Sequence, residues 1–269
     1  MNLGATSLVP VNATLGVLLV VLLLGAASVA SCFHLGPGSG TKRSREILFA
    51  GVRATVQLGL VSVVIVWAVA HVAALLGFLL LMYLVAVRTA GRRITANTTW
   101  WVTAAPIAAG VLPAVLPLLL TGLVPLKGIT LVPITGILIG GALTATVLAG
   151  RRALDELTQR HGEVEAAMAL GLEDRDARLE IARPAASDAL VPGLDQTRTV
   201  GLVTLPGAFV GMLLGGAGPL MAGAVQLFVL VALMAVQAIA VATTLELIAR
   251  HRLHRDIPAP TRTQRGKAH

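Results

Sequence analysis

The stretch TVGLVTLPGAFVGMLLGGAGPLMAGAVQLFVLVALMAVQAIAVATTL, residues 199–245, contains no Lys, Arg, Asp or Glu. An α-helix needs roughly 20 apolar residues to cross the hydrocarbon core of a bilayer. The stretch is therefore long enough for two crossings, with a tight turn where glycine and proline gather at residues 215–219. Its apolar runs are continuous and do not alternate residue by residue, so they predict helices and not the strands of an outer-membrane barrel.

The rest of the chain has the same character. Hydrophobic residues make up 56% of the 269 residues and charged residues only 13%, which is well below the charge of an ordinary soluble domain. Four more stretches carry no charge, namely residues 1–41, 54–87, 94–126 and 128–150. We therefore expect an all-α polytopic membrane protein with about seven transmembrane helices, near residues 8–30, 48–69, 72–89, 100–122, 129–149, 197–215 and 220–246.

Positive charges predict the orientation of these helices. With seven crossings, the basic loops after the first, third and fifth helices and the basic C-terminal end all fall on one side, and of 21 Lys and Arg only Lys127 lies opposite. Merging the second and third helices would divide the basic loops between both sides. Because cytoplasmic loops are enriched in Lys and Arg, we expect the N-terminus outside and the C-terminus in the cytoplasm of a multi-pass protein of the inner (plasma) membrane.

The net charge of +8 is then explained by topology. Basic cytoplasmic segments orient helices and contact anionic membrane lipid, so nucleic acid is not expected as a partner. We expect a transmembrane domain over residues 1–249, a cytoplasmic loop over 151–196 and a basic, disordered cytoplasmic tail over 250–269. The single cysteine, Cys32, excludes a disulfide framework and a cysteine metal cluster, and no metal site is predicted.

The loop is expected to hold two short helices. The first is predicted over residues 153–170, ending at Gly171, because glycine is a favourable residue just past a helix C-terminus. The second is predicted to begin near Glu173 and Asp174, whose carboxylates suit a helix N-terminus. Pro184 predicts a stop or a kink in this second helix.

Six residues of this loop form a pattern with fixed spacing: Glu165, Ala166, Ala167, Gly171, Ile181 and Pro184. The pattern resembles the EAA loop of ABC-transporter permeases, with Arg183 standing where that loop prefers leucine. The resemblance implies a coupling helix that seats in a cleft of an ATP-binding subunit, with the glycine making the turn and the glutamate anchoring the contact. The alternative is an ordinary amphipathic connector, since Glu and Ala are common in helices.

The resemblance extends over nearly the whole chain. RATVQLGLVSVVI (53–65), PITGILIGGALTATVLAGRRALDEL (133–157) and LVPGLDQTRTVGLVTLPGAFVGMLLGGAGPLMAGAVQ (190–226) are similar to the Fet-type iron-export permeases, a family that includes the membrane subunits of plant aluminium-resistance transporters. This resemblance implies a homodimeric permease that exports iron, another metal or a metal-linked small molecule. It also implies a separate ABC ATP-binding subunit.

The chain has no Gly-x-x-x-x-Gly-Lys-Ser/Thr phosphate loop. We therefore expect no cofactor and no enzymatic activity in this chain, with ATP and Mg held by the partner subunit. Two alternatives remain open. A binding-protein-dependent ABC importer is compatible with the EAA pattern. An ion-coupled secondary transporter is less well supported, because such proteins usually carry acids or histidines within their membrane segments.

Polar residues within the apolar stretches are candidates for lining a pore. Buried polar groups are costly in lipid and are often functional, although Thr and Gln also form hydrogen bonds between helices. The residues that we single out as possible pore-lining groups are Gln57, Thr144, Thr204 and Gln226.

Glycines repeated every four residues predict close helix packing. One such pair is Gly136 and Gly140, and a double pair is formed by Gly207, Gly211 and Gly215. The second set follows Pro206, which loosens a helix by removing a backbone donor. It therefore favours either a flexible helix that transmits motion or static packing.

Overall fold

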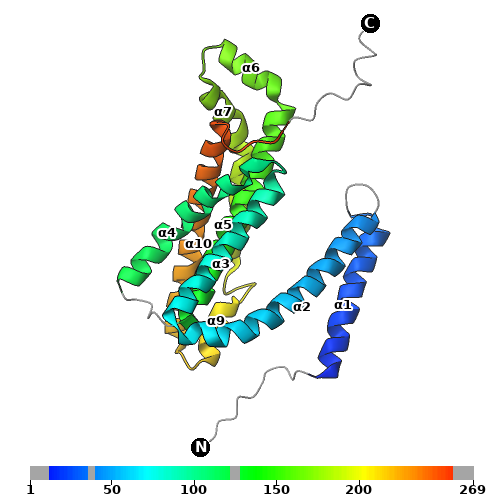
Figure 1. Ribbon diagram of the computed structural model, residues 1–269, viewed down its shortest axis with the longest axis vertical. Helices are drawn as coiled ribbons and strands as arrows, with labels where there is room; N and C mark the ends of the chain where they lie inside the picture. Colours follow the sequence, from blue (N-terminus) through cyan, green and yellow to red (C-terminus); the bar gives the residue numbers. More distant parts are fainter. Residues whose placement is uncertain (1–11, 36–39, 122–127, 257–269) are drawn as a thin grey trace, which may run out of the picture. The chain divides into compact units, whose positions relative to one another are not determined.

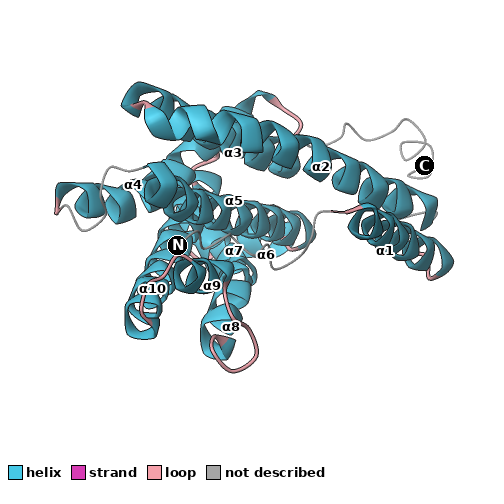
Figure 2. Ribbon diagram, turned by 90° about the horizontal axis from the view of Figure 1, so that it is seen from below, coloured by secondary structure: helices cyan, strands magenta, loops and turns pink. Residues whose placement is uncertain are grey.

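A computed structural model describes residues 12–35, 40–121 and 128–256. Within these ranges the chain forms α-helices, two short 3₁₀ helices and one isolated bridge between Val200 and Thr204, and no strand occurs (Figure 2). Six of the described helices are long and apolar enough to cross a membrane. The prediction of an all-α polytopic membrane protein is confirmed.

Contacts divide the chain into two compact units, Met1–Trp67 and Ala68–His269. The first unit contains α1 (Ala13–Cys32) and most of α2 (Gly40–Ala70). The helix α1 begins where the Asn12 side chain accepts a hydrogen bond from the Leu15 amide, which satisfies one of the free amides of a helix start. The two helices approach closely at Gly51, where an added Cβ would lie 2.7 Å from the Leu23 side chain.

The second unit is built around α5 (Gly128–Gln159) and α10 (Pro219–Ala249), with α3 (Val72–Ile94) and α4 (Ala104–Leu120) packed against them (Figure 1). The core is made of small and aliphatic residues, among them Leu138 and Val236, both with 0% exposure. Close approach depends on glycine. A Cβ at Gly110 of α4 would lie 2.7 Å from the Val236 carbonyl oxygen of α10.

The second and third predicted helices are separate, as expected. The helix α2 ends at Ala70 and α3 begins at Val72, with His71 between them in an extended conformation (φ −131°, ψ 121°). The boundary predicted from the basic loops is therefore confirmed at His71.

The fifth helix is longer than predicted, and this changes the expected loop. The helix α5 continues to Gln159, ten residues beyond the predicted end at 149. The predicted helix over 153–170 is therefore wrong at its start, because the chain breaks at Arg160 and α6 covers only His161–Ala169. The following helix, α7 (Asp174–Ser187), starts where predicted, but it does not stop at Pro184 and continues for three more residues.

The predicted crossing over residues 197–215 is wrong as a single helix. The chain forms α8 (Val191–Thr199), then a non-helical segment over 200–206, then α9 (Gly207–Leu214). Helix α9 has eight residues, about 12 Å of length, which is less than half of a bilayer core. Pro206 explains the position of the break, because proline lacks an amide donor and disfavours helical backbone in the residue before it.

Three basic segments of the second unit meet at one end of the helices (Figure 1). Arg255, beyond α10, donates from Nε to the Ile94 carbonyl oxygen at 2.8 Å and forms an ion pair with Asp155 of α5. Asn97 donates to the His254 carbonyl oxygen at 2.9 Å. The ends of α3, α5 and α10 therefore lie together, as the charge pattern requires.

The first residues of the predicted disordered tail are packed. Leu253 has 0% exposure, and Arg255 is held by α3 and α5. The disorder predicted for residues 250–269 is therefore wrong for 250–256, because apolar burial and ion pairs hold this segment. The remainder of the tail lies outside the described residues, as does Lys127.

Candidate functional site

The α6–α7 hairpin, residues 161–187, projects from the end of α5 and α10 at which the basic segments meet (Figure 1). Its turn is made by Gly171, whose φ of +100° is unfavourable for other residues. The Gly171 amide donates to the Met168 carbonyl at 2.9 Å, and the Leu172 amide donates to the Ala167 carbonyl at 3.2 Å. This pair of hydrogen bonds ends α6 in a Schellman motif, and it agrees with the turn predicted at Gly171.

The tip of the hairpin exposes apolar side chains beside acidic ones. Leu170 is 84% exposed, and Leu172 and Met168 are 41% and 37% exposed. Glu165 and Ala166 also face outward on α6. An exposed apolar tip of this kind is an arrangement suited to contact with another protein.

The buried side of the hairpin packs on the helices of the second unit. Val164 of α6 is 4% exposed, and Ile181 of α7 is 9% exposed. Ile181, predicted from the EAA pattern, therefore packs within this chain. Pro184 is exposed on α7, and Ala167 is partly buried.

The start of α7, just past the turn of the hairpin, is fixed to the end of α10 by an ion pair and a hydrogen bond. Arg175 donates from Nε and Nη2 to the two carboxylate oxygens of Glu246, at 2.9 and 2.7 Å. His251 Nε2 lies 2.8 Å from Asp174 Oδ2. The hydrogen bonds to Glu246 raise the pKa of Arg175, so this cation remains charged at physiological pH.

A further ion pair fixes the joint between α5 and α6. Arg160 donates to Glu156 Oε1 at 3.1 Å and from Nε to Glu163 Oε1 at 2.7 Å. The hydrogen bond from Arg160 lowers the pKa of the Glu163 carboxyl. Sequence reasoning missed these pairs. A signal was present for one of them, since Glu246 is the only charged residue of α10.

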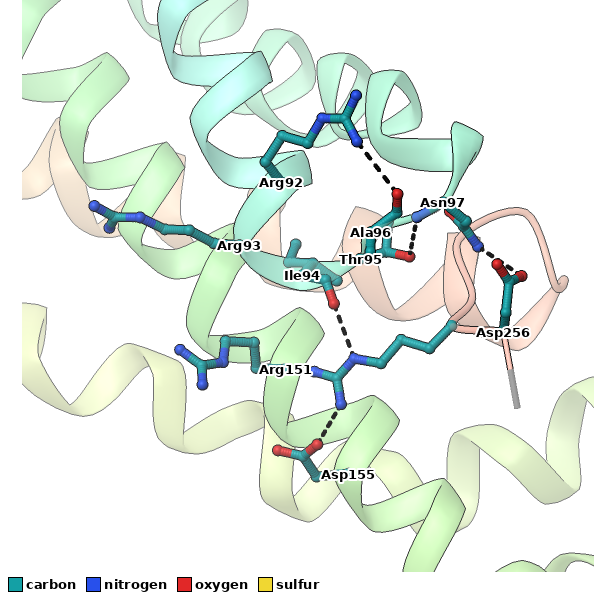
Figure 3. A pocket seen from close by; sticks show the side chains of 10 residues that line it. Arg92, Arg93, Ile94, Thr95, Ala96, Asn97, Arg151, Asp155 and Asp256 are labelled. Carbon is teal, nitrogen blue, oxygen red and sulfur yellow. Dashed lines mark hydrogen bonds and ion pairs between the residues drawn. The ribbon is translucent and has the colours of Figure 1, made fainter. Parts of the chain in front are cut away.

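A basic pocket of about 470 Å³ lies beside the ends of α3 and α5 (Figure 3). Arg255 crosses it to reach Ile94 and Asp155, while Arg93 and Arg151 extend to one side. Arg92 donates to the Ala96 carbonyl at 3.2 Å and lies over the Trp100 ring at 5.5 Å. The pocket is lined by three segments of the chain: the end of α3 with the residues after it, the last part of α5, and the residues after α10.

The predicted pore-lining residues do not all come together. Gln226 of α10 is 6% exposed and lines a cavity of about 210 Å³ with Val200 and Gly201. Thr204 belongs to the same non-helical segment, and its carbonyl accepts from the Gly201 amide at 2.8 Å. Thr144 is exposed on α5 and donates to the Gly140 carbonyl at 3.0 Å. Gln57 is exposed on α2 of the first unit.

The predicted packing glycines also differ from one another. A Cβ at Gly136 would lie 3.0 Å from Met82 of α3, so this residue is at a close contact. Gly140, Gly207 and Gly211 would meet nothing within 4 Å, and Gly215 would meet only carbonyl oxygens of α9 at 3.4 Å, so close packing at these glycines is not seen within the described chain.

Glycines that sequence reasoning did not select make tighter contacts. An added Cβ at Gly141 would overlap Leu233, and one at Gly193 would overlap the Gln237 side chain. Gly193 therefore places α8 directly against α10. As for metal ligands, no group of three or more His, Cys, Asp or Glu side chains gathers within the described ranges.

The sequence model of a family described as "Uncharacterised protein family (UPF0014)" matches residues 14–253. The chain belongs to the UPF0014 family. The matched range includes the hairpin and the helices that hold it, and the resemblance noted in the sequence is confirmed. No solved structure matches the chain.

Several known proteins are similar to the chain over about half to two thirds of their own length. The chain is 36% identical to the Arabidopsis thaliana protein ALUMINUM SENSITIVE 3 over 159 residues, covering 57% of this chain and 58% of that protein. It is 33% identical to the UPF0014 membrane protein STAR2 of Oryza sativa subsp. japonica over 194 residues, covering 70% and 67%. It is 29% identical to the probable iron export permease protein FetB of Escherichia coli over 123 residues, covering 46% and 47%.

The match to the Arabidopsis protein thus spans less than two thirds of that protein's length. Together with the apolar helices, these relatives identify the chain as a multi-pass membrane protein of a transport permease family.

Proposed function

We propose that this chain is the membrane-spanning subunit of an ABC exporter in the inner (plasma) membrane. Two copies form a homodimer, and each copy binds one ATP-binding subunit, which holds ATP and Mg, through its α6–α7 hairpin. The observation that carries the proposal is the hairpin itself, which has an exposed apolar tip at Leu170 and, just past the turn, a helix start bonded to α10.

The anchoring pairs give the hairpin a mechanical role. Arg175 and Asp174, at the start of α7, join the turn of the hairpin to Glu246 near the end of α10 and to His251 just beyond it. Arg160 joins α6 to the end of α5. Since α5 and α10 are the central helices of the second unit, movement of the tip is passed to both of them through packed and bonded contacts.

The proposed cargo is iron, another metal or a metal-linked small molecule. Support comes from two relatives, because the Escherichia coli protein is named a probable iron export permease and the Arabidopsis protein is named for aluminium sensitivity. In this proposal ATP hydrolysis takes place in the partner subunit, and the chain itself is not an enzyme.

The test is co-purification of an ATP-binding subunit with the wild-type chain and with the double variant Glu165→Arg, Gly171→Arg. The single variant Glu165→Arg repeats the test without straining the turn. Glu180→Arg, on the exposed side of α7, is the matched control for charge reversal. We expect the wild type and the control to bring down the ATP-binding subunit and to show iron-stimulated ATP hydrolysis. A wild-type chain that binds no ATP-binding subunit, or tip variants that bind as well as the control, would overturn the proposal.

A further inference from the structure

The interrupted crossing, defined as residues 191–214 with α8, the non-helical segment and α9, packs beside α10, which is long and apolar enough to cross a membrane. The only charged residue of α10, Glu246, is taken as the end of its apolar span. Gly193 of α8 is in contact with Gln237, and Val200 and Gly201 share a cavity with Leu230. With a rise of 1.5 Å per residue, Gln237 lies about 14 Å along α10 from Glu246, and Leu230 lies about 24 Å from it. The part of α8 between these contacts is therefore near the middle of a hydrocarbon core about 30 Å thick.

That part of α8 carries charged side chains. Asp195 and Arg198 have side-chain exposures of 60% and 72%, and Arg198 Nη1 lies 3.5 Å from Asp195 Oδ1. Gln196 between them is also exposed. Ionised side chains at this depth are costly in lipid, and in membrane proteins they face the protein interior or a water-filled cavity.

The backbone that follows these charged side chains is a second observation about the surroundings of this part of the chain. Residues 200–206 are not helical, and their backbone bonds locally, for example from the Gly201 amide to the Thr204 carbonyl at 2.8 Å. Non-helical backbone at membrane depth is tolerated where it is buried in protein or lines water. This backbone therefore needs protein or water beside it, although the exposed side chains of Leu202, Val203 and Leu205 are apolar.

A third observation comes from the facing helix. Gln226 is buried, and its Oε1 atom has no hydrogen-bond partner among the described residues. It lines the cavity of about 210 Å³ that the non-helical segment also lines. An unpaired buried amide oxygen costs free energy, and a water molecule or a polar cargo in this cavity removes that cost.

We infer that α8 lines a water-filled path through the membrane, with Asp195, Gln196 and Arg198 facing the water. The inference rests on the proposed transport function, and it assigns the path to a segment that neither the EAA pattern nor the apolar helices identify. The tip of the non-helical segment is apolar, with Leu202 90% exposed, so the inference concerns α8 and the Gln226 cavity.

The chemistry of this face suits a particular class of cargo. One carboxylate, one guanidinium and one amide offer both donors and acceptors, and their formal charges cancel. A bare divalent cation is held by several oxygen ligands at once. The face therefore favours a chelated or otherwise polar cargo over a bare metal ion.

Thiol accessibility tests the inference in the full chain. Cys32 is the only cysteine, so Cys32→Ser supplies the background for Asp195→Cys, Gln196→Cys and Arg198→Cys. The control is Leu112→Cys on α4, which is 52% exposed and lies two residues from Gly110, whose neighbour on α10 is Val236. The control thus samples an apolar surface at a similar depth.

The measurement is the rate of modification by a charged, membrane-impermeant methanethiosulfonate in membrane vesicles of both orientations. A thiol in apolar surroundings has a raised pKa and little thiolate, so we expect the α8 cysteines to react about tenfold faster than the control. Equal rates, or disulfide-linked dimers at α8 without modification, would overturn the inference, because lipid or a second copy would then cover this face. Gln196→Cys changes no charge and serves if the other two variants do not fold.

Co-purification of the ATP-binding subunit with the same variants separates this inference from the proposed function. If the ATP-binding subunit binds but the α8 cysteines do not react, the water-filled path is contradicted and the proposed function is not. If the α8 cysteines react but no ATP-binding subunit binds, the path is supported and the ABC role is contradicted.

Discussion

The α6–α7 hairpin and the helix α8 of the interrupted crossing lie close together in the chain, and both carry charged side chains next to α10, but their polar groups are satisfied differently. At the start of α7, Arg175 donates to both carboxylate oxygens of Glu246, at 2.9 and 2.7 Å. In α8, Arg198 Nη1 lies 3.5 Å from Asp195 Oδ1 and both side chains are exposed, and on the facing α10 the Gln226 Oε1 atom is unpaired within the described residues. The charges at the start of α7 are thus matched by α10, although Arg178 Nε of α7 is buried without a hydrogen-bond partner among the described residues. The polar groups of α8 and the facing Gln226 amide oxygen depend on groups outside these side chains.

The two regions also differ in whether their structure requires glycine. Gly171 in the hairpin has φ +100°, whereas Gly211 in the crossing is helical and would meet nothing within 4 Å if it carried a Cβ. Glycine is thus required by the backbone in the hairpin and is not required by packing within this chain in α9. The predictions below test each side of this contrast.

The largest expected effect is at the hairpin turn. Gly171→Val places a β-branched residue at positive φ, which we expect to destabilise the turn by roughly 1–2 kcal/mol. Hydrogen exchange of the α6 amides measures this directly. Gly211→Val is the control, with little change expected. Equal protection of α6 in both variants would contradict the role of Gly171.

The second effect concerns the anchor between hairpin and α10. Arg175→Ala removes both hydrogen bonds to Glu246, so we expect the ATP-binding subunit to bind normally while transport-coupled ATP hydrolysis falls about tenfold. Arg183→Ala, on the exposed side of α7, is the control and should leave hydrolysis unchanged. Loss of binding together with activity would show that Arg175 supports the tip and does not transmit its movement.

The third effect separates transport from stability. Gln226→Leu removes a buried acceptor that has no partner among the described residues and that water or a polar cargo can satisfy, so we expect transport to slow while the free energy of unfolding changes by less than about 1 kcal/mol. Thr144→Val is the control, because its exposed hydroxyl already bonds the Gly140 carbonyl. A destabilised Gln226→Leu protein would mean that the amide is satisfied, and the contrast between the two regions would weaken.

The smallest effect is a pH dependence of the α5–α6 joint. The Arg160 hydrogen bond lowers the pKa of Glu163 in the folded chain, so the stability gained from this pair is complete above the ordinary pKa of glutamate. It is lost as the pH falls through the lowered value. Protection of the α6 amides should therefore decline in acid, below the usual glutamate range, and Glu163→Gln should remove that decline. An acid response that persists in the variant would assign it to another carboxyl.

Much of the fold follows from the positions of charged residues, because charge is excluded from lipid. The uncharged stretches predicted the positions of α1 to α5 and α10. The basic loops predicted two separate helices where the structure has a break at His71. Gly171 was predictable for a local reason, since only glycine suits that turn.

The remaining features depend on contacts between segments distant in sequence. Apolar composition over 197–215 does not specify where a crossing is interrupted, and the prediction of one helix failed there. The pairing of Arg175 with Glu246, and of Gly193 with Gln237, joins positions that no spacing rule relates. The helix α8 was not predicted, because its residues fall across the boundary between the predicted loop over 151–196 and the predicted crossing over 197–215.

The central claim, that the hairpin tip docks into an ATP-binding subunit, is tested most directly by site-specific photo-cross-linking in native membranes. A photoreactive amino acid is placed at Leu170, which is 84% exposed at the tip, or at Glu180 on the side of α7. We predict a cross-link to an ATP-binding subunit from position 170 and none from position 180. A cross-link to lipid alone from position 170, with the ATP-binding subunit present in the same membrane, would contradict it.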